Sequence, residues 1–414
     1  MARTFDDWLG AYLEYAATHS EAPKRFHLWT GVATIAGALR RRVWIDQRAY
    51  QWTPNFYIIL VGPAGVVTKS TTMKLGMSLL ERIPEIHFGP DSLTWQALGE
   101  ALMDGGEVFE YPPGTKTIIS CLTLAISELG TLMKLDDDGL VSMFIDMWEG
   151  QKSLRPCQHK TRSQKTIEIR NPWLNIIGCT TPTWLRSNFP EHIVGGGLVS
   201  RIIFVYGDKK SQLIAYPSQR WDEADYLLLR DHLVADLTEI SQIEGPFTIT
   251  DEAMEWAGDS PGGWYYSVQS SRPPHLSHSR FDPYVSRKQT HLHKIAMILA
   301  AAERDCNMTI TKEHLIKADI MLTDVEQDMI KVFESIGMVQ EARQRNELEQ
   351  TLRIRGKMTI EELYATCSTM MTSKEFNEAV ISGINSGLFL KGPNMIPGSR
   401  FSLELSPSAA AKPP

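Results

Sequence analysis

The chain lacks three features that would each suggest a class at once: a long apolar run, a paired cysteine motif and an excess of positive charge. No apolar stretch reaches the roughly 18 residues of a membrane helix, and the first residues lack the apolar core of a signal peptide. We therefore expect no membrane partner. The five cysteines, at positions 121, 157, 179, 306 and 367, form no C-x-x-C pair. Such an odd, dispersed set predicts reduced thiols and a cytoplasmic location.

The charge balance limits how the chain can hold nucleic acid. The net charge is −7 and the pI about 5.9, which excludes a basic field over the whole surface. Any DNA contact must then come from a local patch, or from loops that an oligomer brings together. A length of 414 residues exceeds one compact core and predicts several domains.

The strongest local signal is GPAGVVTKS, Gly62 to Ser70, which follows the apolar run NFYIILV and precedes a helical pattern. A strand, a glycine-rich turn, a lysine, a hydroxyl and a helix form the order of a phosphate-binding loop. Its N–H groups hold phosphates, its lysine neutralises them, and Ser70 or Thr71 binds Mg²⁺. The standard pattern has glycine directly before the lysine, whereas here Thr68 must adopt a backbone conformation that glycine adopts at lower cost. A plain strand-to-helix turn is the alternative. The predicted nucleotide contacts in the loop are Gly62, Pro63, Ala64, Gly65, Val66, Val67, Thr68, Lys69, Ser70 and Thr71.

Two later apolar runs end in polar residues that phosphoryl transfer needs. TIISCLTLAI predicts a buried parallel strand followed by Ser127 and Glu128. We predict that Glu128 orients the attacking water and joins Ser70 at the metal, although the usual preceding aspartate is absent. WLNIIGCTTP predicts a strand that lies between the first two and ends in Thr181, a sensor of the γ-phosphate. The alternatives are a glutamate that caps the next helix and an ordinary strand end.

Two arginines are candidates for stabilising the transition state. Arg201 opens the strand pattern in LVSRIIFVY, after the glycines at 195–197, and we predict that it acts on the nucleotide of a neighbouring subunit; a local salt bridge is the alternative. Arg287 opens the helical pattern RKQTHLHKIAMILAAA and is predicted to reach the phosphates of its own subunit. Lys288 and Arg280 compete for that role.

Taken together, FHLWTGVATIAGALRRRVWID, NFYIILVGPAGVVTKSTT, ISELG, NPWLNIIGCTTP and GLVSRIIFVY resemble a family of phage and mobile-element P-loop ATPases of the replicative-helicase type. The resemblance covers residues 20–330, and the run CTTP to VSR is also similar to the minichromosome maintenance helicases of the AAA+ class. It implies a ring, expected to be a hexamer, that uses ATP and Mg²⁺ on single-stranded or forked DNA in a bacterial host. Lys69 would belong to one subunit and Arg201 to the next. Thr68 and Ser127 depart from the family pattern.

Basic residues gather in the segment 149–165, between Glu128 and the sensor strand, where ring ATPases of this class often have a pore loop. A solvated surface hairpin is the alternative. The predicted DNA contacts are Lys152, Arg155, Lys160, Arg162 and Lys165. Near the end of the chain, three short helical patterns followed by two strands predict a winged helix, which would bind DNA or other replication proteins. Its basic residues are Arg343, Arg345, Arg353, Arg355 and Lys357.

These patterns predict an α/β fold with a P-loop NTPase core of the AAA+ or RecA-like kind. The predicted parts are an N-terminal helical segment (1–50), the P-loop core (51–215), a helical lid (216–335), a winged-helix-like domain (336–405) and a disordered tail (406–414). The leading functional hypothesis is an ATP-driven DNA motor, a replicative helicase. The alternatives are an ATP-dependent helicase loader or replication initiator, and a nucleotide-binding scaffold without hydrolysis.

Overall fold

The computed structural model divides into two compact units, Met1–Ile336 and Gly337–Pro414. The division falls beside the predicted start of the last domain at residue 336. The predicted segments 1–50, 51–215 and 216–335 lie within the first unit. The structure describes residues 3–90, 94–132, 138–149, 157–160, 166–189, 197–220, 222–333, 340–368, 371–392 and 401–410.

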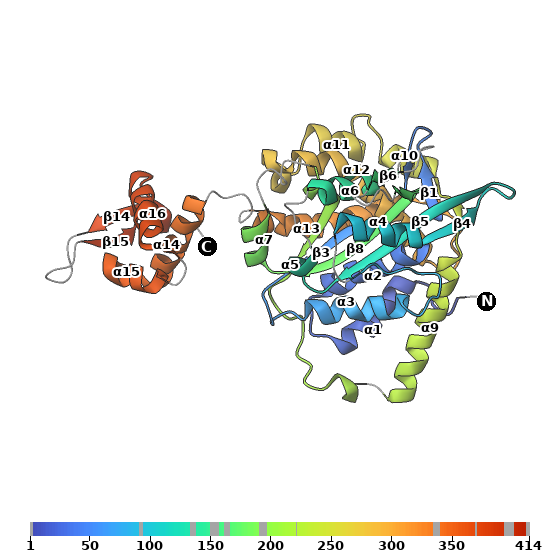
Figure 1. Ribbon diagram of the computed structural model, residues 1–414, viewed down its shortest axis with the longest axis horizontal. Helices are drawn as coiled ribbons and strands as arrows, with labels where there is room; N and C mark the ends of the chain where they lie inside the picture. Colours follow the sequence, from blue (N-terminus) through green and yellow to red (C-terminus); the bar gives the residue numbers. More distant parts are fainter. Residues whose placement is uncertain are drawn as a thin grey trace. The chain divides into compact units, whose positions relative to one another are not determined.

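A five-stranded sheet forms the centre of the first unit (Figure 1). Its order is β4-β5-β8-β3-β9, with β4 antiparallel to β5 and the other four strands parallel. The strands are β3 (Tyr57–Val61), β4 (Gly106–Glu110), β5 (Lys116–Ile126), β8 (Pro172–Thr180) and β9 (Ile202–Tyr206). The predicted α/β class with a parallel sheet is therefore confirmed.

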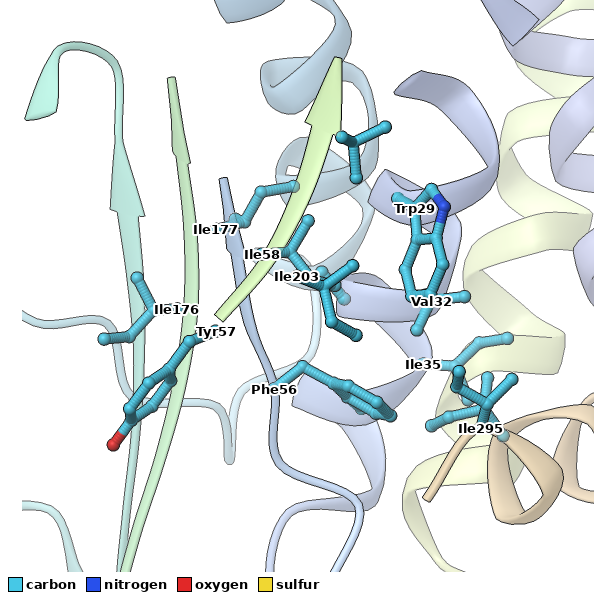
Figure 2. Close-up of a cluster of buried hydrophobic side chains, with 14 of the residues drawn as sticks. Trp29, Val32, Ile35, Phe56, Tyr57, Ile58, Ile176, Ile177, Ile203 and Ile295 are labelled. Carbon is cyan, nitrogen blue, oxygen red and sulfur yellow. The ribbon is translucent and has the colours of Figure 1, made fainter. Parts of the chain in front are cut away.

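Both faces of the sheet are covered, which is why its strands are continuous apolar runs. Figure 2 shows Phe56 and Ile58 on the side of Trp29 and Val32, which belong to α2 (Lys24–Leu39). Tyr57 points to the other face, where its hydroxyl donates to the carbonyl oxygen of Phe144 at 2.7 Å. Burial of side chains of this size contributes about 1.5–3 kcal/mol each, and this burial fixes the register of the strand ends that carry the site.

The N-terminal helices pack on the core of their own chain, where α1, α2, α3 and α9 contact one another. Ser20, at the end of α1, lies with its hydroxyl 3.3 Å from those of Thr68 and Thr72. The helices of the first unit are α1 (Trp8–His19), α2, α3 (Lys69–Leu80), α4 (Trp95–Asp104), α5 (Leu129–Leu132), α6 (Asp138–Trp148), α7 (Pro182–Asn188), α9 (Glu223–Ser241), α10 (Asp251–Trp256), α11 (Trp264–Ser270), α12 (Asp282–Ala302) and α13 (Lys312–Phe333).

Three strands, β1, β2 and β3, precede the phosphate loop in residues 43–61. A turn with Arg48 at φ 64° closes a hairpin of the first two strands, and these pair outside the central sheet in the order β10-β1-β2. The short strands of the first unit are β1 (Val43–Asp46), β2 (Gln51–Trp52), β6 (Cys157–Lys160), β7 (Thr166–Ile169), β10 (Gly245–Pro246), β11 (Thr248–Ile249) and β12 (Thr309–Ile310).

The second unit has its own apolar core, three main helices and a three-stranded antiparallel sheet of order β13-β15-β14. Thr359 and Thr372 each begin a helix with a reciprocal capping box, which satisfies the first N–H groups of that helix. Its elements are α14 (Gln340–Arg355), β13 (Met358–Thr359), α15 (Ile360–Cys367), α16 (Ser373–Asn385), β14 (Phe389–Gly392), β15 (Ser402–Leu405) and α17 (Pro407–Ala410).

The predicted disorder of the tail 406–414 is wrong for its first part. Residues 407–410 form α17, because the Ser406 hydroxyl accepts from the Ala409 amide at 3.3 Å and Arg353 donates to the Ala409 carbonyl at 2.7 Å. Residues 411–414 lie outside the described part of the chain.

Candidate functional site

The loop between β3 and α3 has the backbone that its sequence predicted. Gly65 has φ 72°, and Thr68, the residue directly before α3, has φ 43° and ψ 39°. A left-handed conformation costs a threonine of order 1 kcal/mol or more, so the surrounding contacts must hold Thr68 there. Gly62 has no space for a side chain, since a Cβ atom would lie 2.4 Å from the carbonyl oxygen of Gly207.

Lys69 folds back over this loop. Its ammonium donates to the carbonyl oxygens of Gly62 at 2.7 Å and Pro63 at 2.9 Å. Burial lowers the pKa of Lys69, while the nearby Cys179 and Glu128 raise it. Lys69 and Glu128 therefore interact electrostatically, as a lysine and an acid at one nucleotide site would.

The N-terminus of α3 also offers backbone N–H groups as hydrogen-bond donors. Thr68 makes no side-chain capping bond to the helix, so its hydroxyl does not take the first-turn N–H groups that a helix N-terminus presents to anions. Ser70 is half-buried and Thr71 is exposed at the same turn. An ammonium, backbone N–H groups and a hydroxyl are the donor set that a magnesium triphosphate requires, so the residues fit that group.

Glu128 and Thr181 lie at the same edge of the sheet as the loop. Ile126, the last residue of β5, pairs with Gly178, and Val61, the last residue of β3, pairs with Thr180. The strand β8 thus lies between the strand that leads to the loop and the strand that leads to Glu128, as the sensor assignment required. The Thr181 hydroxyl accepts from the Trp184 amide at 3.1 Å and caps α7, which leaves its own proton free to donate.

Arg201 lies at the opposite edge. It ends a short 3₁₀ turn before β9, whose first residue Ile202 pairs with Tyr57, the first residue of β3. Four residue steps of about 3.3 Å separate this level from Val61, a distance of about 13 Å along the strand. Arg201 therefore does not reach the loop of its own chain.

Within its own chain Arg201 makes the salt bridge that we gave as the alternative. Its guanidinium donates to the Glu149 carboxylate and, at 2.6 Å, to the Gly197 carbonyl oxygen, and its side chain is 5% exposed. Burial lowers the pKa of Arg201, and Glu149 counters that effect. The guanidinium carbon also lies 5.7 Å from the centre of the Trp148 ring.

The structure does not support the predicted contact of Arg287 with the phosphates of its own subunit. Its guanidinium lies 3.6 Å from the Glu149 carboxylate that also pairs with Arg201. The reason is that α12 packs across the N-terminal edge of the sheet, where His291 bonds the Ser200 carbonyl oxygen at 3.0 Å. Lys288, its first competitor, is buried and bonds Glu326 at 3.0 Å, and the side chain of Arg280 lies outside the described part.

Sequence reasoning missed the residues that organise this second edge, foremost Glu149 and Lys294. Lys294 is 1% exposed, and its ammonium donates to the side-chain and main-chain oxygens of Asn55 at 2.8 and 3.2 Å and to the Trp148 carbonyl at 3.1 Å. It also lies 3.7 Å from the Trp148 ring centre. The available signal was a lysine inside the apolar stretch HKIAMILAAA, since a buried lysine needs dedicated partners.

The predicted DNA segment forms a hairpin where it is described. Strands β6 and β7 pair antiparallel, Lys160 opposite Thr166, between α6 and the sensor strand. Lys152, Arg155, Arg162 and Lys165 lie outside the described residues, and only the backbone of Lys160 is within them.

The described residues contain no group of three or more histidine, cysteine or acidic side chains that would hold a metal alone. Among them no helix is long and apolar enough to cross a membrane. Comparison with models of known protein families finds no match, and neither does a search of curated protein sequences.

Proposed function

We propose that this protein is an ATP-driven DNA motor that works as a ring, with a replicative helicase of phage or mobile-element type as the expected class and a hexamer as the expected ring. One observation carries the proposal: the lysine loop and Glu128 lie at one edge of the sheet, on either side of β8, while Arg201 and Arg287 lie at the other. A site completed by a neighbouring copy explains this separation.

At the loop edge, Lys69 and the first N–H groups of α3 would hold the β- and γ-phosphates, and the Ser70 hydroxyl would bind Mg²⁺ together with phosphate oxygens and water. Bound magnesium supplies neutralisation of the developing phosphate charge. Glu128 would accept the proton of the attacking water, and the free proton of Thr181 would bond the γ-phosphate. To bind the phosphates, Lys69 must release the carbonyl oxygens of Gly62 and Pro63.

At the other edge, Arg201 and Arg287 would approach the γ-phosphate bound by the next subunit. Two guanidinium groups that share one carboxylate retain donors for phosphate oxygens. The hairpin of β6 and β7 would contact DNA. The second unit, as a winged helix, would bind either DNA or other replication proteins, and binding assays with each decide between the two.

The first experiment measures ATP hydrolysis by the wild type and Lys69→Ala, with and without single-stranded DNA, alongside the particle mass with ATP. DNA-stimulated hydrolysis that requires Lys69, in a ring-sized particle, supports the motor. Intact unwinding by Lys69→Ala would contradict it.

A loader or initiator is the second candidate, favoured by the departures at Thr68 and Ser127 from the usual motifs. ATP binding without stimulated hydrolysis, in a monomer or dimer, would support it. Failure to bind any nucleotide would instead indicate a non-enzymatic scaffold whose ATP site has decayed.

A further inference from the structure

Glu149 occupies a central position among the cations at the N-terminal edge of the sheet. It follows α6 directly, and one of its carboxylate oxygens accepts from Arg201 and lies 3.6 Å from Arg287. In the part of the chain that the structure describes, the salt bridges of these two arginines are both with Glu149. Glu149 itself is 35% exposed, whereas Arg201 is 5% exposed.

Arg201 is anchored independently of this acid. The Gly197 carbonyl oxygen accepts from it, and the Trp148 ring lies under its guanidinium. Lys294 lies 3.7 Å from the centre of the same ring and donates to the Trp148 carbonyl oxygen at 3.1 Å. Removal of Glu149 would therefore free one donor face of Arg201 without releasing the arginine from its place.

The neighbouring lysine on α12 shows a different arrangement. Lys288 bonds the fully buried Glu326 at 3.0 Å and lies 3.4 Å from Asp319, so one cation has two acids. At Glu149 two arginines share one acid. Two acids of α13 thus balance the charge of Lys288, whereas the arginine pair can accept a further anion.

We propose that Glu149 is a latch: it holds Arg201 and Arg287 inside their own subunit and competes with the phosphate of a nucleotide on a neighbouring copy. Its role toward that nucleotide rests on the proposed function. Carboxylate and phosphate oxygens use the same guanidinium donors. The partly exposed position of Glu149, directly after α6, lets it withdraw while Arg201 stays anchored. Glu149 is a positioning residue that sets how readily the arginines engage.

The test uses inorganic pyrophosphate as the anion and the full chain with Lys69→Ala, which weakens binding at the loop. The rise of the unfolding temperature with pyrophosphate concentration, measured at low salt, gives the pyrophosphate affinity of isolated subunits with and without Glu149→Gln. We expect about tenfold tighter binding with Glu149→Gln, since a neutral amide of the same size no longer competes. Adding Arg201→Ala should abolish that gain. Glu244→Gln removes a comparable acid from Arg42, 2.6 Å away, and serves as the matched control.

No gain over Glu244→Gln, or a gain that survives Arg201→Ala, would overturn the latch. Should Glu149→Gln unfold, Glu149→Asp retains the charge one methylene further from the guanidinium groups and should tighten binding by about threefold. A second readout is the rate of ATP hydrolysis as a function of protein concentration, in a chain whose only substitution is Glu149→Gln. The protein concentration that gives half of the maximal rate should be lower for this variant than for the wild type. A wild type without hydrolysis would contradict the proposed function, and the pyrophosphate comparison would still decide on the latch.

Discussion

The two ends of the central sheet hold cations in opposite ways. At the C-terminal edge Lys69 is half-buried and donates to two carbonyl oxygens of a loop whose residues 64–66 are exposed. At the N-terminal edge Lys294 and Arg201 are almost fully buried, and bond fixed oxygens and the Trp148 ring. The first cation can leave its partners at small cost, whereas the second group cannot. The contrast suggests that the first edge receives a ligand, and that the second edge rigidly supports arginine donors for the nucleotide of a neighbouring subunit.

The largest effect is expected from a substitution of Lys69, which disrupts only the C-terminal edge. Lys69→Ala should lower ATP hydrolysis by about 10³-fold or more, because it removes the cation that stabilises transferring phosphate charge. The fold should remain, since Lys69 bonds only carbonyl oxygens of its own loop. Hydrolysis assays and circular dichroism measure both, with Lys74→Ala, an exposed lysine of the same helix, as the control. Equal losses in the two variants would remove the basis for a phosphate site.

A mixing experiment sharpens the comparison by asking whether the two edges serve one site from two subunits. Arg201→Ala and Lys69→Ala should each be inactive alone, but their equal mixture should recover about a quarter of wild-type hydrolysis, since one interface in four then has both groups intact. No recovery, with rings still formed by mass measurement, would count against a shared site.

The difference between the edges also explains what the sequence could predict. The loop, its lysine and its hydroxyl are consecutive residues, so their order identified the site, and the left-handed Thr68 was expected from its place where glycine is usual. The opposite edge joins Glu149, Arg201 and Arg287, which are far apart in the chain, and only the packing of α12 brings them together. The position of Arg201 was in principle available, because the first residue of a parallel strand lies away from the last residue of its neighbour. The partner Glu149 was not, since nothing in DMWEG distinguishes it from a solvated acid.

A matched pair of lysine substitutions, one at each edge, should change the free energy of unfolding by different amounts. Lys294→Met leaves the oxygens of Asn55 and Trp148 without their donor in a buried site, which should lower the free energy of unfolding by about 2 kcal/mol. Lys69→Met should change it by less than about 0.5 kcal/mol, as for an ordinary surface position. Urea unfolding of both variants measures the difference. Equal effects would show that the N-terminal edge is no more rigid than the loop.

His291 ties α12 to the residue before Arg201 and should make stability depend on pH. Burial, together with the nearby Lys294 and Arg287, lowers its pKa to about 3, although the bond to the Ser200 carbonyl opposes this. Between the ordinary histidine pKa of about 6.5 and that value, the unfolded chain binds a proton that the folded chain does not. Stability should therefore fall as the pH falls through this window, by up to about 1.4 kcal/mol per pH unit from this residue.

His291→Gln keeps a donor for the Ser200 carbonyl but cannot titrate, so its unfolding free energy should depend less steeply on pH between 6 and 4. Above pH 7 His291 is neutral in both the folded and the unfolded chain, so the unfolding free energies of the wild type and the variant should depend on pH in parallel. Urea unfolding across this range measures the two slopes. The same slope in both proteins at acid pH would mean that His291 protonates in the folded chain, and that the edge around Arg201 opens enough to admit water, contrary to the rigid support inferred from its burial.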